Sequence, residues 1–310
     1  MELDKIIQGD ALAILQKLPA ESVDCIVTSP PYYGLRDYEV EGQIGSEKTL
    51  DDYLNRLLAV TAELGRVLKS TGTFWWNHGD SYGTGSGSGV RNGKQATNRG
   101  TQTNEKWQQK GKAALQGYEK SLLLQPYRLA MRMVDDQNWI LRNVIIWHKP
   151  NAMPHSVKDR FTVDYEPIFF FTKSKQYFFE QQFEAADLRE NEYRRALRRK
   201  NADDYNLKKP YQGNFPKSFG DPDKRNKRSV WAISTKSYVD AHFAVYPPEL
   251  LAIPIKAGCP KGGIVLDPFM GSGTTAVVAR KLGRHFIGIE LNKSYIEIAT
   301  RRLSQGVLVA

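Results

Sequence analysis

Two short apolar runs in this chain each end in a segment that interrupts regular structure. Residues 23–27 run into TSPPY at 28–32, and residues 264–266 run into DPFMGSGTT at 267–275. Short apolar runs bounded by proline or glycine are typical of buried strands. Open α/β sheets bind their ligands where strands end, in the turns that follow. The two segments therefore predict an α/β fold whose functional site is built from two strand ends.

Predicted strands and helices alternate along most of the 310 residues. Apolar and β-branched runs predict strands at 6–7, 23–28, 73–76, 140–147, 168–172, 264–266 and 285–289. Apolar residues three and four apart predict helices at 11–18, 50–68, 121–135, 248–256, 274–282 and 293–303. This alternation predicts a mostly parallel sheet with helices on both faces. The length allows one large domain with an insert or two modest domains.

Positive charge is concentrated in two segments that interrupt this alternation. The formal net charge is +10, and residues 83–120 and 184–228 each contribute +5, so the other 227 residues sum to zero. A neutral body with two basic inserts is typical of a protein that binds a polyanion such as nucleic acid. The alternative is a pair of solvated loops. The first insert opens with the low-complexity run GTGSGSG and is predicted to be a mobile loop that orders on DNA.

Other features of the sequence exclude several classes of protein. No apolar run approaches the roughly 20 residues that span a bilayer. The N-terminus lacks the basic and then apolar order of a signal peptide. Two cysteines, Cys25 and Cys259, indicate neither a disulfide framework nor a zinc site. We therefore expect a reduced, cytoplasmic protein without a membrane segment or a bound metal.

The glycine-rich segment 267–275 has the chemistry of a ligand-binding turn. Gly271 and Gly273 let the backbone turn tightly and approach a ligand, and the following helix offers unpaired N–H groups. Met270 and Thr274 stand where a GxGxxG or a Walker A motif needs other residues, so neither motif is present. Glu290 ends the next predicted strand, where a carboxylate can accept hydrogen bonds from ribose hydroxyls.

The full string resembles the DPFxGSGTT cofactor motif of the DNA amino-methyltransferases, which bind S-adenosylmethionine. The resemblance implies that matching residues of this chain line the methionine and adenosine portions of the cofactor. These residues are Thr28, Asp267, Phe269, Gly271, Ser272, Gly273 and Thr274. The resemblance also implies that Glu290 binds the ribose and that Asp10, in the sequence QGD, lies opposite the adenine.

The segment TSPPY resembles the catalytic motif of the same family. The exocyclic amine of a base is a poor nucleophile because its lone pair is delocalised into the ring. Ser29 Oγ and the Pro30 carbonyl can accept hydrogen bonds from that amine. Pro30 and Pro31 fix the backbone that presents these acceptors. Tyr32 offers a ring on which a base can stack after it has flipped out of the duplex.

The order of the two motifs is similar to that of the β group of this family, a circular permutation of the common methyltransferase fold. The resemblance implies a catalytic domain formed by 1–173 and 236–310, with the basic loop 83–120 as an insert. It implies a target-recognition region at 174–235. In that fold, the strands that precede the two motifs are neighbours, so both motifs open into one cleft.

Further residues are expected around the base and the DNA. Segments 147–154 and 166–173 resemble family segments that flank the base pocket. Asn77 or Asp80, at the end of a predicted strand, is a candidate for contact with the substrate, whereas His148 is expected to pack or to contact phosphate. A basic stripe on one helical face is expected to contact phosphates or guanine edges, and it consists of Arg194, Arg195, Arg198, Arg199 and Lys200.

The sequence thus predicts a site-specific DNA methyltransferase that acts on an exocyclic amine. Serine at position 29 is commoner in the cytosine-N4 group, so N4 of cytosine is favoured over N6 of adenine or an RNA base. Methylation at carbon 5 of cytosine is set aside because Cys25 lies in a strand and Cys259 in a turn. The alternatives from other classes are a non-catalytic nucleic-acid-binding module and a nucleotide-dependent oxidoreductase, which the missing GxGxxG disfavours.

The resemblance also sets expectations about partners. Double-stranded DNA is the expected substrate, and the enzyme is expected to be a monomer or a homodimer. A cognate restriction endonuclease is a candidate partner. The gene would belong to a bacterium, an archaeon or a phage.

Overall fold

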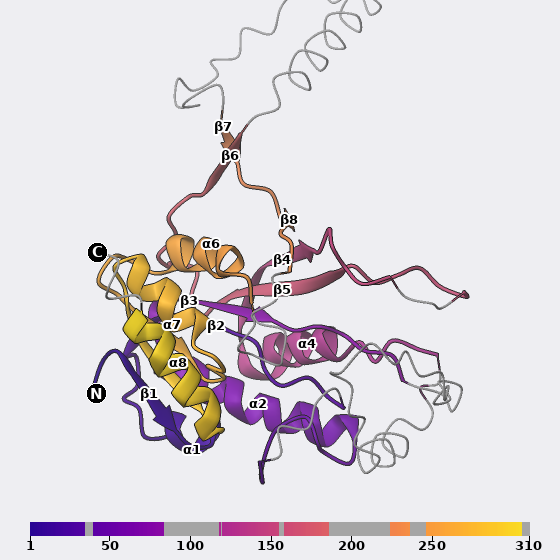
Figure 1. Cartoon of the computed structure of the whole chain (residues 1–310), viewed down its shortest axis with the longest axis horizontal. Helices are drawn as coiled ribbons and strands as arrows, with labels where there is room; N and C mark the ends of the chain where they lie inside the picture. The colour runs from indigo at the N-terminus through magenta and orange to yellow at the C-terminus, as the bar shows by residue number, and fades with distance from the viewer. Residues whose placement is uncertain are drawn as a thin grey trace, which may run out of the picture. The chain divides into compact units, whose positions relative to one another are not determined.

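An eight-stranded sheet organises the larger of two units in the computed structural model (Figure 1). The structure describes residues 1–34, 40–83, 118, 120–154, 158–185, 224–235 and 246–305. The smaller unit is Gln181–Arg228, and the larger unit contains the rest of the chain. The boundaries predicted for a recognition region, 174–235, enclose the smaller unit and remain a prediction.

The strands of the large sheet follow the order β1-β10-β9-β2-β3-β5-β4-β8. Their bounds are β1 Lys5–Gln8, β2 Val23–Thr28, β3 Leu68–Asn77, β4 Ile140–His148, β5 Tyr165–Thr172, β8 Val230–Ala232, β9 Ile264–Asp267 and β10 His285–Glu290. From β1 to β3 each strand is parallel to its neighbour. The predicted mostly parallel sheet is therefore confirmed.

The antiparallel part of the sheet was not predicted. Strand β5 is antiparallel to both β3 and β4, and β8 is parallel to β4. Strands β4 and β5 follow each other along the chain, and no helix lies among the described residues of the segment between them. Antiparallel strands can be joined without a helical crossover, whereas parallel strands need one. The absence of a helical pattern between 148 and 165 was the available signal.

Within the described ranges, six helices cover the two faces of the sheet. Their bounds are α1 Ala11–Leu15, α2 Leu50–Val67, α4 Gln125–Gln137, α6 Pro248–Gly258, α7 Thr274–Lys281 and α8 Lys293–Gln305. Helices α1, α2 and α4 pack on one face, and α6, α7 and α8 pack on the other. Each helix overlaps a predicted one, which confirms the α/β class.

Local sequence explains where helices begin and end. Thr49 caps α2, since its hydroxyl accepts a 3.0 Å hydrogen bond from the backbone N–H of Asp52. Asp10 caps α1 in the same way through Ala13 N, at 3.0 Å. Helix α1 ends three residues before its predicted end at 18. The last turn tightens there, with Leu18 N bonded to Leu15 O, because Pro19 cannot continue the helix.

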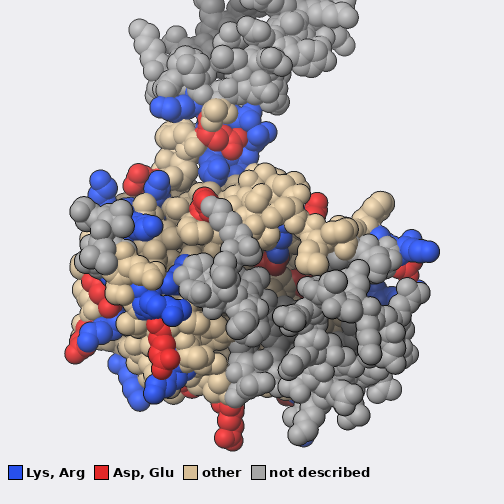
Figure 2. All heavy atoms as spheres, viewed as in Figure 1, with Lys and Arg blue, Asp and Glu red and all other residues tan. Residues whose placement is uncertain are grey.

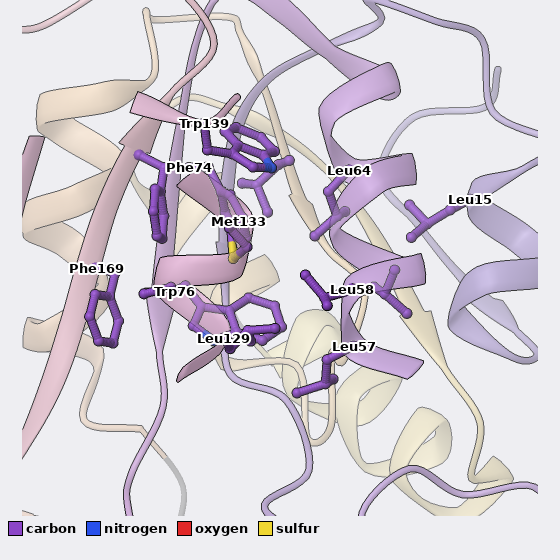
Figure 3. Packing of buried hydrophobic residues seen from close by; sticks show 14 of the residues in the cluster. Leu15, Leu57, Leu58, Leu64, Phe74, Trp76, Leu129, Met133, Trp139 and Phe169 are labelled. Carbon is purple, nitrogen blue, oxygen red and sulfur yellow. The ribbon is translucent and has the colours of Figure 1, made fainter. Parts of the chain in front are cut away.

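Alternate residues of β3 serve the two hydrophobic cores. Phe74 and Trp76 are buried with the leucines of α1, α2 and α4, as Figure 3 shows. Trp75 points to the opposite face, where it stacks on Phe170 with ring centroids 4.0 Å apart. This alternation is the period of two that a strand imposes on its side chains. It places large aromatic residues on both sides of one strand, so β3 is fixed from both faces.

The smaller unit is described as two strands, β6 Phe183–Ala185 and β7 Lys224–Asn226, which pair antiparallel. Glu184 accepts hydrogen bonds from Arg225 and Arg228 at 2.9 and 2.6 Å.

Figure 2 shows the acidic and basic side chains mixed on the drawn face of the larger unit. Among the described helices, none is both long and apolar enough to cross a bilayer.

Gly258 tests how tightly α6 packs on the sheet. A Cβ at this position would lie 2.1 Å from Thr73 Oγ1 and 2.6 Å from Trp75 Nε1. We expect Gly258→Ala to lower the free energy of unfolding by about 1–3 kcal/mol, the usual cost of overpacking. Gly65→Ala in α2 is the matched control, because its Cβ would meet only Trp139 at 3.3 Å. Denaturant unfolding measures both, and equal stability of the two variants would contradict the packing described.

Candidate active site

Strands β2 and β9 are hydrogen-bonded neighbours, with Cys25 opposite Val265 and Ile26 opposite Leu266. Their ends therefore lie at the same edge of the sheet, and the segments 28–32 and 267–275 follow there side by side. This confirms the predicted adjacency of the two motifs. The two segments are separated by more than 200 residues in the sequence.

The Asp267 carboxylate ties the two segments together. Its Oδ1 accepts hydrogen bonds from Thr28 Oγ1 at 2.6 Å and from Phe269 N at 3.0 Å, and its Oδ2 accepts from Thr275 Oγ1 at 2.6 Å. Asp267 is 2% exposed. Burial raises the pKa of Asp267 to about 6, although the two hydroxyl donors oppose this shift.

One cavity of about 340 Å³ opens at this edge, and both segments line it. It brings together eleven of the thirteen predicted catalytic and cofactor residues. These are Asp10, Ser29, Pro30, Pro31, Tyr32, Asp267, Phe269, Gly271, Ser272, Thr274 and Glu290. Thr28 and Gly273 lie outside its lining.

The two predicted residues outside the lining hold the cavity walls in place. Thr28 is 1% exposed, and its hydroxyl is bonded to Asp267. Gly273 has φ +80°, and a Cβ there would lie 2.6 Å from the Cβ of Ala299 in α8. The structure therefore requires glycine at 273 for close approach of α8. In the sequence, this glycine was interpreted as contacting the ligand.

The glycine turn has open space beside Gly271, a residue that lines the cavity. Gly271 has φ +53°, and a Cβ built there meets no described atom within 4 Å. Its N–H donates to Glu290 Oε2 at 2.7 Å, and Asn292 N donates to the other oxygen at 2.8 Å. Burial raises the pKa of Glu290. The carboxylates of Glu290 and Asp10, at the ends of neighbouring strands, can accept hydrogen bonds from a hydroxyl-bearing ligand.

Ser29 and Tyr32 continue into a polar network that the sequence did not reveal. Ser29 Oγ donates to Tyr32 Oη at 3.3 Å, and Tyr32 Oη donates to Glu166 Oε2 at 3.0 Å. The other oxygen of Glu166 is paired with Lys149. Glu166 and Lys149 both line the cavity, and they belong to the segments predicted to flank the base pocket.

A second hydrogen-bond network, formed by Tyr53, His78 and Trp76, holds the backbone of the segment 28–32. Tyr53 Oη donates to the Pro31 carbonyl at 2.9 Å and lies 3.0 Å from His78 Nε2. Trp76 Nε1 donates to His78 Nδ1 at 3.3 Å, so we assign the imidazole proton to Nε2, which donates to Tyr53. Burial lowers the pKa of His78 to about 3, so the ring stays neutral. The contacts join three separate elements, and no local pattern could have indicated them.

Of the two substrate candidates at the end of β3, only Asn77 lines the cavity. Its Nδ2 donates to the Pro167 carbonyl at 3.2 Å. The Oδ1 is buried and has no hydrogen-bond partner among the described residues. Asp80 instead accepts from Leu124 N and Gln125 N at the start of α4, at 3.0 and 3.3 Å.

Several predicted DNA contacts lie outside the described residues. They include the whole basic stripe, Arg194, Arg195, Arg198, Arg199 and Lys200, and nearly all of the basic loop 83–120. His148 is described, and its Nε2 lies 3.5 Å from Asp164 Oδ2. It is not part of the cavity lining.

Comparison with known proteins places this geometry among DNA methylases. A family model described as DNA methylase, N6_N4_Mtase, matches residues 23–301. The Type II methyltransferase M.XycI of Xanthomonas campestris pv. cyanopsidis is 41% identical over 307 residues, covering 96% of this chain and 87% of that protein. The Type II methyltransferase M.Cfr9I of Citrobacter freundii is 40% identical over 304 residues, with coverages of 96% and 87%.

Solved structures show the same fold at lower identity. A PvuII DNA methyltransferase described as cytosine-N4-specific aligns with a TM-score of 0.63 at 18% identity, over 96% of this chain and 85% of that chain. A protein of Thermus thermophilus, solved in complex with S-adenosyl-L-methionine, aligns with a TM-score of 0.57 at 22% identity. That alignment covers 98% of this chain and 96% of the other.

The buried Asp267 predicts a specific dependence of stability on pH. Its folded-state pKa of about 6 lies above the ordinary 3.8, so the folded state binds the proton more tightly than the unfolded state. Relative to the Asp267→Asn variant, the wild type should therefore gain stability as the pH falls from 7 to 4. Two pKa units correspond to about 3 kcal/mol. Denaturant unfolding at each pH measures the difference, and a constant difference would contradict this assignment.

Proposed function

This chain belongs to the N6/N4 family of DNA methylases, and on this premise we propose that it methylates N4 of cytosine at a specific DNA site. The family assignment makes it an S-adenosylmethionine-dependent DNA methyltransferase. The observation that carries the proposal is the single cavity lined by both the catalytic segment and the glycine turn. A methyl donor and an acceptor base held in one cavity can react directly.

The proposed cofactor site occupies the glycine side of the cavity. Open space beside Gly271 leaves room for the ligand, and the carboxylates of Glu290 and Asp10 would accept hydrogen bonds from ribose and adenine. When bound, S-adenosylmethionine supplies a methyl group on a cationic sulfur. Phe269, Ser272 and Thr274 complete the lining. In this proposal, Thr28, Asp267 and Gly273 act as supports of the site.

The proposed base site occupies the other side. Ser29 Oγ and the Pro30 carbonyl would accept hydrogen bonds from the exocyclic amine, and Tyr32 would stack on the flipped base. The acceptors are preorganised because the Pro31 carbonyl is held by Tyr53, and preorganised acceptors cost no reorganisation during reaction. Asn77 Oδ1 is an additional buried acceptor at this end of the cavity.

The choice of N4 of cytosine rests on Ser29. Serine at this position is commoner in the cytosine-N4 group, whereas adenine-N6 enzymes more often carry aspartate or asparagine. Either residue can accept a hydrogen bond from the amine, so the pocket chemistry itself is shared by both reactions. N6-methyladenine is therefore the outcome that would change the base while leaving the mechanism in place.

The proposal extends to the partners of the enzyme. Duplex DNA is its substrate, and we assign recognition of the target sequence to the region 174–235, with Arg194, Arg195, Arg198, Arg199 and Lys200 on phosphates or base edges. The Type II names of the relatives support a role in restriction and modification beside a cognate endonuclease. A monomer or homodimer acting on DNA in a bacterial cytoplasm is consistent with this role.

Ser29→Ala tests the proposed chemistry. Loss of the hydroxyl should reduce the single-turnover rate of methylation by about 10²-fold or more, since one positioned hydrogen-bonding group contributes that much in comparable sites. Binding of S-adenosylmethionine, measured by calorimetry, should change little. To identify the product, the wild-type protein is incubated with S-adenosylmethionine and mixed-sequence duplex DNA, and the DNA is then digested to nucleosides. Mass spectrometry of these nucleosides should find N4-methylcytosine.

The matched control is Ser304→Ala, which removes a serine hydroxyl from the exposed end of α8. This control should methylate at the wild-type rate. A Ser29→Ala variant as fast as the wild type would disprove the assigned role of Ser29. A wild-type protein that binds the cofactor and methylates no base in DNA or RNA would instead support a silent binding module.

A further inference from the structure

A continuous chain of hydrogen bonds leads from Ser29 to a carboxylate that the sequence did not single out. Ser29 Oγ donates to Tyr32 Oη at 3.3 Å, and Tyr32 Oη donates to Glu166 Oε2 at 3.0 Å. All three residues line the cavity. Both hydroxyl donors in this chain point toward Glu166. The lone pairs of Ser29 Oγ are thereby left available to a donor in the cavity.

Methylation of an amine requires that the nitrogen lose a proton. A serine hydroxyl is not a base by itself, and it can take up a proton only if its own proton moves on. The described lining near Ser29 offers one carboxylate that is connected to it through hydroxyl groups, and that carboxylate is Glu166. The connection exists in the folded protein before any base is bound.

We infer that Ser29, Tyr32 and Glu166 form a proton relay that ends on the Glu166 carboxylate. As the amine nitrogen bonds to the methyl carbon, the carbon–sulfur bond breaks and its electron pair remains on sulfur. The amine proton passes to Ser29 Oγ, the serine proton to Tyr32 Oη, and the tyrosine proton to Glu166 Oε2. One sulfonium cation and one carboxylate anion are neutralised, so charge and atoms balance. The inference rests on the proposed function.

The surroundings of Glu166 suit this role. Lys149 holds Oε1, and its ammonium lies 4.5 Å from the centre of the Trp147 ring, so Oε2 is left facing Tyr32. Burial and the neighbouring carboxylate raise the pKa of Tyr32 well above its ordinary value, so the phenol keeps its proton between turnovers. Among the residues that the structure describes, Lys149 is the charged group paired with Glu166. His78 lies behind the Tyr32 ring and stays neutral.

Gly79 is explained by the same geometry. A Cβ at position 79 would lie 2.7 Å from Tyr32 Cε2 and 3.2 Å from Glu166 Oε1. Any larger residue would push the phenol and the carboxylate apart. Glycine here therefore preserves the contact between two members of the relay, although its φ is unremarkable and its sequence context gives no sign of this role.

Glu166→Gln separates proton transfer from positioning. A glutamine oxygen can still accept the Tyr32 hydrogen bond, but the amide cannot take up the proton. We expect the single-turnover rate to fall by about 10²-fold, the usual contribution of a positioned base. The melting temperature should stay within a few degrees of the wild type. The affinity for the cofactor, and the affinity for duplex DNA without cofactor, should stay within twofold.

Tyr32→Phe interrupts the relay and keeps the ring for stacking, so it should slow methylation by a similar factor. The double variant should be no slower than either single variant, because both interrupt one path. Glu21→Gln is the matched control: Glu21 is also paired with a lysine, Lys173, at 3.2 Å, but lies outside the cavity. It should be as active as the wild type.

The outcomes distinguish the relay from the proposed function. A Glu166→Gln or a Tyr32→Phe variant that stays within threefold of the wild-type rate would overturn the relay. If Glu166→Gln does not fold, Tyr32→Phe decides by the same criterion. If the wild-type protein methylates no base, the proposed function fails first, and the relay fails with it.

Discussion

The buried carboxylate of Asp267 is the contact on which the arrangement of the site depends. It accepts hydrogen bonds from Thr28 at the end of β2 and from Thr275 at the start of α7. Two strands, a helix and both functional segments therefore meet at one side chain. A buried charge is costly unless it is well hydrogen-bonded, and here three donors share that task. The register between β2 and β9 and the position of the glycine turn are consequently fixed together.

Rigidity on the catalytic side has a different origin. The prolines of the segment 28–32 restrict its backbone, and the Tyr53–His78–Trp76 network holds the Pro31 carbonyl from below. Tyr53 and Trp76 lie in the core on one face of the sheet. Aromatic residues of β3 and β5 alternate between that core and the core on the opposite face. The hydroxyl and carbonyl groups are oriented before a base binds. The free energy needed to orient them is therefore part of folding and does not reduce the rate of the reaction. The Ser29–Tyr32–Glu166 chain extends this preorganisation to proton transfer.

Much of the architecture could be predicted from local sequence. The long helix α2 follows from its apolar spacing and the Thr49 cap, and the parallel strands follow from apolar runs that end in turns. The antiparallel direction of β5 was not predicted, because it depends on a connection that contains no helix. The early end of α1 was not predicted either, because it depends on a single proline. Gly273 remains predicted as a ligand contact, and the fold gives a further reason for glycine there, because a Cβ would lie 2.6 Å from the Cβ of Ala299 in α8.

By itself, the sequence determined the fold class, the family and the two segments that we propose carry the chemistry, because these depend on short stretches whose residues lie near one another along the chain. Only the tertiary structure decided that Asp267 supports the site, that Asn77 lines the cavity, and that Glu166 and Lys149 join Ser29 and Tyr32. Glu166 lies 134 residues from Tyr32. Such contacts are set by which strands become neighbours and in which register, and no local pattern of residue types encodes that distance.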